Sequence, residues 1–174
     1  MIIPQTEWLP PKEFPDLRQH EEIAIDLETR DPELKSKGSG AITGVGEVVG
    51  IAVAVEGWKG YFPIAHEQGP NMERKKVLEW FKDVCESPAV KIFHNAMYDV
   101  CWIRNLGIKI NGLILDTMIA SSFDSPRSRS YINHASECGT LGSGFAGYPP
   151  IPSADRACVL LDIKKLEISI IINI

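Results

Sequence analysis

The feature that most constrains this chain is a short alternating segment, Ile23-Ala24-Ile25-Asp26-Leu27-Glu28. Large apolar side chains alternate there with small or acidic ones, which is the period-2 pattern of a β-strand with one buried face. Ile25 and Leu27 then point into a core, whereas Asp26 and Glu28 project together from the opposite face. Any domain built around this strand must accommodate two neighbouring carboxylates on one side of it.

The remaining segments alternate between strand and helix patterns. Glu56-Gly57 is a turn between two strand-like runs and predicts a hairpin, Asn71 is a candidate helix N-cap, and Gly107 has the residue type that ends a helix. The expected strands cover 23–28, 48–55, 59–63, 90–94 and 113–115, the expected helices cover 72–85, 96–106 and a segment from 117 to 122, and 30–47 is expected to be a polar loop. This order predicts an α/β domain with a mixed sheet.

The pattern is regular only in the middle of the chain. Residues 1–22 are rich in proline and charge and form an expected lead-in segment that packs Trp8 and Phe14 on the core. Residues 23–122 form the expected core. Residues 123–174 have no countable period and end in the apolar run ISIIINI, so we expect a poorly packed tail, derived from truncation or from a shifted reading frame near residue 123.

Composition narrows the class of protein. The chain has 174 residues, a net charge of −5 and four cysteines without a CxxC pair, which argues against a zinc knuckle or a disulfide framework. No apolar run reaches the ~18 residues of a membrane span, so we expect a cytoplasmic protein without a membrane partner. Because an acidic chain lacks the basic surface that neutralises phosphates, metal ions would have to supply positive charge at a nucleic-acid site.

Asp26 and Glu28 are the first candidates for chemistry. Two carboxylates on one strand face repel each other and resist desolvation unless a divalent cation lies between them. Oxygen ligands without His or Cys suit a hard ion such as Mg²⁺ or Mn²⁺. The alternative is an ordinary strand end that runs into solvent with two hydrated acids, and the residues alone leave both interpretations open.

A second candidate group is Phe93-His94-Asn95-Ala96-Met97-Tyr98-Asp99. Asn95 and Asp99 are four residues apart at the start of an expected helix, so they share one helix face. The alternative is that Asn95 only caps this helix and that the helix dipole favours Asp99. Asp116, which precedes the third expected helix, is either another N-cap or a further acid in the site.

Together, the segments IAIDLET, FHNAMYD and LDTMIAS resemble, in order and spacing, the first two exonuclease motifs and the following strand of the DnaQ-like DEDD 3′-5′ exonucleases. The similarity is strongest to the proofreading domain of family A DNA polymerases, including phage ones, and it covers residues 20–122. The resemblance implies a ribonuclease H-like fold with a mixed five-stranded sheet flanked by helices. It also implies two Mg²⁺ or Mn²⁺ ions and hydrolysis of single-stranded DNA from the 3′ end.

The resemblance also assigns roles by position. It makes Asp26, Glu28 and Asp99 catalytic metal ligands, and it places Leu27, Thr29 and Asn95 along the terminal nucleotide, with Asp116 as a further candidate. It implies a single-stranded DNA 3′ end and a DNA polymerase domain as partners, in the cytoplasm of a bacterial or phage-infected cell.

The chain departs from the family at the third motif, a Tyr or His four residues before a final Asp. Neither spacing occurs in residues 117–174, so the fourth ligand is unassigned. Two other functions therefore stay open. One is a catalytically inactive module that binds nucleic acid or a partner, and the other is a ribonuclease H-like nuclease that acts on RNA.

Overall fold

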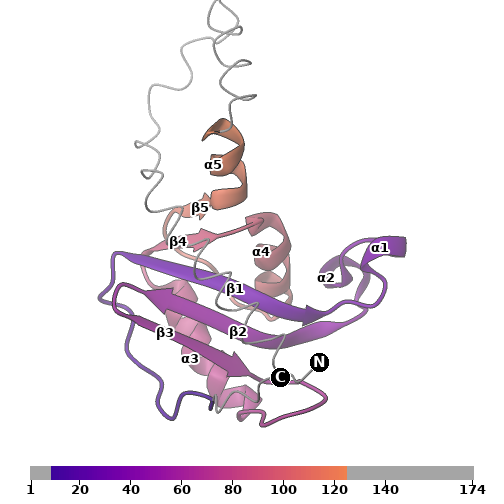
Figure 1. Cartoon of the computed structure of the whole chain (residues 1–174), viewed down its shortest axis with the longest axis horizontal. Coiled ribbons are helices and arrows are strands. Elements are labelled where there is room, and N and C mark those ends of the chain that lie inside the picture. Colours follow the sequence, from indigo (N-terminus) through magenta and orange to yellow (C-terminus); the bar gives the residue numbers. More distant parts are fainter. Residues whose placement is uncertain (1–8, 125–174) are drawn as a thin grey trace, which may run out of the picture.

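The computed structural model describes residues 9–124, and they are organised around a five-stranded mixed sheet (Figure 1). The strands are β1 (Glu22–Arg30), β2 (Glu47–Val55), β3 (Trp58–Pro63), β4 (Val90–Phe93) and β5 (Ile114–Asp116), and the helices are α1 (Leu34–Lys37), α2 (Gly40–Thr43), α3 (Arg74–Glu86), α4 (Ala96–Asn105) and α5 (Thr117–Asp124). The strand order is β3-β2-β1-β4-β5. β2 is antiparallel to both β1 and β3, whereas β4 is parallel to both β1 and β5. The predicted α/β class with a mixed sheet is confirmed.

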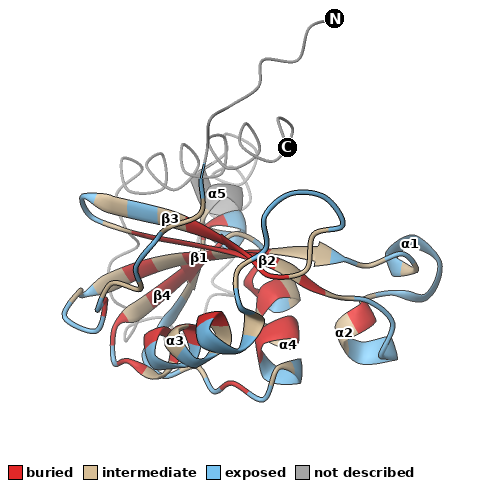
Figure 2. Cartoon of the chain, turned by 90° about the horizontal axis from the view of Figure 1, so that it is seen from below, coloured by how far each residue is buried: buried red, intermediate tan, exposed pale blue. Residues whose placement is uncertain are grey.

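The core lies between one face of the sheet and helices α3 and α4, which lie on the same side of it (Figure 2). Ile23, Ile25 and Leu27 of the central strand β1 are buried in this core. Asp26 and Glu28 alternate with them and are only partly buried. The period-2 pattern of β1 therefore separates a packed apolar face from an acidic face, as predicted.

Two glycines end regular structure where the sequence indicated. Gly57 turns the chain between β2 and β3 with φ 80°. Gly107 follows α4 with φ 76°, and its N–H donates to the Arg104 carbonyl at 2.9 Å. A positive φ is accessible to glycine at little steric cost, so the predicted hairpin and the predicted end of the helix are both confirmed.

The predicted start of the first long helix is wrong. Helix α3 begins at Arg74, after Glu73, instead of being capped by Asn71. The Asn71 side chain instead brackets the backbone of His66, accepting from its N–H and donating to its carbonyl, both at 2.8 Å. The Asn71 side chain therefore stabilises the loop between β3 and α3 instead of capping α3.

The segment between β1 and β2 was expected to be a polar loop, and it contains the two short helices α1 and α2. Asp31 Oδ2 accepts a hydrogen bond from the Gly40 N–H at 2.9 Å, and Ser39 Oγ accepts one from the Ala41 N–H at 3.3 Å. These side chains stabilise the start of α2, and each of the two helices has only four residues, too few to show a period.

The described part of the lead-in packs on the core. Phe14 stacks against Phe62 with ring centroids 5.8 Å apart, and Leu17 is fully within the core. Trp8 and almost all of the tail expected over 123–174 lie outside the described residues. Within residues 9–124, no helix is long and apolar enough to cross a membrane.

Candidate active site

The two acids of β1 lie where the central strand parts from its parallel neighbour. The pairing of β1 with β4 ends at Ala24 opposite Ile92, and α4 begins four residues after Ile92, at Ala96. β1 continues on its other edge beside β2, with an irregularity in register between Glu28 and Thr29 that re-aims the end of the strand. The carboxyl end of β1 therefore lies near the first turn of α4, where Thr29 Oγ1 and the Tyr98 hydroxyl are 2.7 Å apart.

Asp99 lies in the first turn of α4 and is only 3% exposed. It shares the packed face of the helix with Ala96 and Ile103, which are also buried. An acid that served only the helix dipole would remain in solvent, because burying a carboxylate is costly. The dipole alone therefore does not account for the placement of Asp99.

Tyr98 connects α4 to the end of β1. Its hydroxyl is 2.7 Å from Thr29 Oγ1 and donates to Asp31 Oδ2 at 3.1 Å. Burial raises the pKa of Tyr98, and the nearby Asp31 adds to the increase, so the phenol keeps its proton at neutral pH. Sequence reasoning missed this contact, although Tyr98 stands directly before Asp99 in the second motif.

Asn95 has φ 69° and ψ 54°, and it is the one residue other than glycine with a positive φ among those the structure describes. It occupies the N-cap position of α4, as one of the two interpretations predicted, but its side chain makes no capping hydrogen bond. A left-handed backbone outside glycine costs of order 1–3 kcal/mol and persists only where neighbouring contacts impose it.

Asp116 imposes the conformation at Asn95. Its two carboxylate oxygens accept from the backbone N–H groups of Asn95 at 3.0 Å and Ala96 at 2.9 Å, and Oδ1 also accepts from the Met118 N–H at 2.9 Å. Asp116 therefore caps the start of α5, as one of the two interpretations predicted, and also the start of α4. These bonds commit both oxygens to backbone groups.

The structure corrects the expectation for Leu27. Its side chain is 6% exposed and belongs to the core, because the period of the strand places it opposite Asp26 and Glu28. It is therefore not available to the base of a nucleotide. Thr29, by contrast, lies beyond the register shift and is partly exposed.

The acids of the site do not complete a metal cage among the described residues. Over residues 9–124, no group of three or more His, Cys, Asp or Glu side chains is arranged to hold a metal ion. The convergence of Asp26, Glu28 and Asp99 on one ion stays a prediction. What the structure provides is a pair of oxygen donors on one face of β1 and a buried third carboxylate in the first turn of α4.

Comparison with known proteins assigns the family. A model of the 3′-5′ exonuclease domain of A-type DNA polymerases matches residues 2–134, so the chain belongs to this 3′-5′ exonuclease family. It is similar to a DNA-directed DNA polymerase of Pseudomonas phage M6, with 31% identity over 137 residues, covering 69% of this chain. The chain spans 20% of that polymerase's length.

Solved structures of nucleases also align with this chain. Brucella melitensis NrnC with bound Mg²⁺ aligns with a TM-score of 0.42 and 18% identity, over 87% of this chain and 73% of that chain. An apo form of a nuclease aligns with a TM-score of 0.42 and 20% identity, over 85% and 70%.

Proposed function

We propose that this chain hydrolyses single-stranded DNA one nucleotide at a time from the 3′ end, with residues 23–122 as its catalytic core. The observation that carries the proposal is the pairing of Asp26 and Glu28 on one face of the central strand, in a chain of the 3′-5′ exonuclease family. The family membership indicates the type of reaction, and the paired acids mark the proposed catalytic site.

The donor set fits a hard divalent cation. Asp26 and Glu28 offer only oxygen ligands, and a cation would relieve their mutual repulsion. Asp99 would add the third carboxylate from α4. When bound, Mg²⁺ or Mn²⁺ would supply an activated water and charge stabilisation at the departing 3′ oxygen. The role of the protein is to fix these carboxylates and the terminal phosphodiester relative to one another.

Asn95 and Thr29 are the proposed contacts for the terminal nucleotide. Asn95 is exposed, and because Asp116 caps the helix for it, its amide can donate and accept hydrogen bonds with a ligand. Thr29 presents a hydroxyl that Tyr98 holds at the end of β1. Asp116, whose oxygens bind backbone N–H groups, is proposed to shape the site and not to bind metal.

The phage relative suggests the wider setting. Because that relative is a DNA polymerase and the matched region is a small part of it, we propose that this domain works beside a polymerase domain and removes 3′-terminal nucleotides. The proposed location is the cytoplasm of a bacterial or phage-infected cell.

The test is degradation of a 5′-labelled single-stranded DNA oligonucleotide in Mg²⁺, in Mn²⁺ and in EDTA. RNA of the same sequence is the second substrate. The double variant Asp26→Asn/Glu28→Gln controls for contaminating nuclease, and Asp83→Asn, an exposed acid on α3, is the matched control. We expect a metal-dependent ladder shortened from the 3′ end with wild type and Asp83→Asn, and none with the double variant.

The alternatives give different results in the same assay. Shortening of RNA but not of DNA would replace the substrate with RNA. Binding of either oligonucleotide without hydrolysis would identify a nucleic-acid-binding module. Equal hydrolysis by wild type and by the double variant would show that Asp26 and Glu28 do not catalyse the reaction.

A further inference from the structure

The face of the sheet that carries Asp26 and Glu28 on β1 continues across β2 to β3. Directly paired residues in an antiparallel sheet present their side chains on the same face. In one row, Asp26 pairs with Ala52, which pairs with Tyr61. In the next row, Glu28 pairs with Gly50, so the position beside Glu28 on β2 has no side chain of its own.

The space at Gly50 is filled by Tyr61. A Cβ at Gly50 would lie 1.8 Å from the Tyr61 hydroxyl oxygen and 2.4 Å from the ring carbon that bears it. Tyr61 therefore extends from its own row into that of Glu28, and its hydroxyl takes the place of the missing Cβ. Because Glu28 and Gly50 are directly paired, the hydroxyl occupies the position that neighbours the Glu28 side chain on this face.

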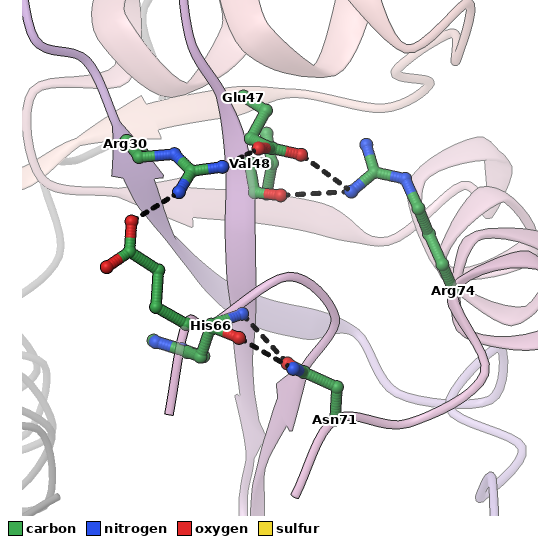
Figure 3. A network of polar contacts seen from close by, with 7 residues as sticks. Arg30, Glu47, Val48, His66, Asn71 and Arg74 are labelled. Atoms are coloured by element: carbon green, nitrogen blue, oxygen red, sulfur yellow. Dashed lines mark hydrogen bonds and ion pairs between the residues drawn. The ribbon is translucent and has the colours of Figure 1, made fainter. Parts of the chain in front are cut away.

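His66 orients this hydroxyl. Its Nε2 is hydrogen-bonded to the Tyr61 hydroxyl, and the two rings pack with centroids 5.8 Å apart. Asn71 brackets the His66 backbone, and Glu67 forms an ion pair at 2.7 Å with Arg30, two residues beyond Glu28 on β1 (Figure 3). The loop that carries the imidazole is thus fixed to the acid-bearing strand itself.

From this arrangement we propose that Tyr61 is a positioning residue for Glu28 and that His66 sets its orientation. In the proposed chain, His66 Nε2–H donates to the Tyr61 oxygen, and the Tyr61 O–H donates to the Glu28 carboxylate. Burial lowers the pKa of His66, so at neutral pH the imidazole is uncharged and carries a single N–H. The chain fixes one rotamer of Glu28 beside Asp26. The inference rests on the proposed function, since it supplies the geometry that Glu28 needs there.

If Tyr61 only packed the sheet, its substitution would lower activity and melting temperature together. The test therefore measures catalysis and stability separately. Tyr61→Phe keeps the ring and removes the hydroxyl, and Gly50→Ala places a Cβ where the hydroxyl lies. His66→Ala removes the partner, and His66→Gln keeps a side-chain N–H. His20→Gln is the matched control away from the site.

We expect Tyr61→Phe, Gly50→Ala and His66→Ala each to lower kcat by about 10–100-fold and Mn²⁺ affinity by a similar factor, because groups that orient metal ligands have effects of this size. KM and the melting temperature should change little in Tyr61→Phe. His66→Gln should recover part of the loss. Since Tyr61 and His66 act as a unit, combining Tyr61→Phe with His66→Ala should cost no more than either substitution alone.

Wild-type kcat and Mn²⁺ affinity in Tyr61→Phe would overturn the inference, as would activity losses that only follow a lower melting temperature. A wild-type chain that binds Mn²⁺ without hydrolysing DNA would contradict the proposed function alone, and Mn²⁺ affinity would then decide the role of Tyr61. A wild-type chain that neither binds Mn²⁺ nor hydrolyses DNA would overturn both.

Discussion

The two faces of β1 use the same six-residue segment for opposite purposes. On one face, Ile23, Ile25 and Leu27 are at most 6% exposed and pack under α3 and α4. On the other face, Asp26 and Glu28 remain partly accessible beside small residues of β2. The apolar face stabilises the fold through buried area, whereas the acidic face gathers like charges that repel each other.

This difference indicates how function is added to a sheet. The apolar face fixes the register of β1, because a slip of one residue would bring Asp26 and Glu28 into the core. The apolar residues of β1 thereby determine on which side of the sheet the two carboxylates lie. Substitutions on one face should therefore change stability, and substitutions on the other should change catalysis and metal binding.

The largest effect is expected from Ile25→Ala on the apolar face. Ile25 is 3% exposed, and truncating a buried isoleucine costs about 2–5 kcal/mol through lost transfer energy and the cavity left behind. Chemical denaturation should show this loss of unfolding free energy. Ile42→Ala, at a position 79% exposed, is the control and should change stability little. Equal effects of the two substitutions would contradict the division between the faces.

Asp26→Asn, at the neighbouring position, should have the opposite profile. It removes one of two like charges, so unfolding free energy should be unchanged or slightly higher. Loss of a proposed metal ligand should lower hydrolysis by at least about a hundredfold, or roughly 2.7 kcal/mol in activation free energy. Mn²⁺ titration and oligonucleotide degradation measure the loss. An Asp26→Asn variant that is destabilised as much as Ile25→Ala would mean that the acid has a structural role.

The sequence predicts those parts of the fold that depend on local pattern. The alternation in β1, the turn at Gly57 and the helix end at Gly107 all depend on residues within a few positions of one another. The start of α3 was missed because Asn71, a good capping residue by type, binds the His66 backbone instead. That contact belongs to the shape of one loop and has no periodic signature.

For the site, the sequence predicts which side chains share a face, but not which elements meet. The same-face placement of Asp26 and Glu28 follows from strand period alone. The contact of Tyr98 with Thr29 depends on how α4 packs against β1. The position of Tyr61 beside Glu28 depends on the register of three strands and on the missing Cβ of Gly50. Such relations are non-local, and no spacing in the sequence encodes them.

A smaller effect should distinguish Asp116 from the other acids near the site. Because its oxygens cap the starts of both α4 and α5, Asp116→Ala should lower stability by about 1–2 kcal/mol. Its commitment to backbone N–H groups predicts that Mn²⁺ affinity stays within about twofold of wild type, since no ligand is lost. Thermal unfolding and metal titration of the same samples test this. A metal affinity reduced as far as in Asp26→Asn would make Asp116 a ligand.

The last prediction compares how fast two cysteine thiols are labelled, one of them buried on the apolar side of the sheet. Cys85 of α3 is fully buried, and burial raises its pKa to about 12, an increase only partly offset by the nearby Lys91. Because the thiolate is the reactive form, a shift from the ordinary value of 9.0 lowers its fraction at pH 8 by about a thousandfold. Cys101 on α4 is partly exposed and provides the internal comparison. Iodoacetamide labelling at pH 8, mapped by peptide mass, should therefore modify Cys101 well before Cys85, and denaturant should remove the difference.

The same labelling can compare the two faces of β1. Ile25→Ala should bring the labelling rate of Cys85 closer to that of Cys101, because a weaker apolar face opens more often, whereas Asp26→Asn should leave the labelling rate of Cys85 unchanged. Faster labelling of Cys85 in Asp26→Asn than in Ile25→Ala would show that the two faces of β1 are not energetically separate.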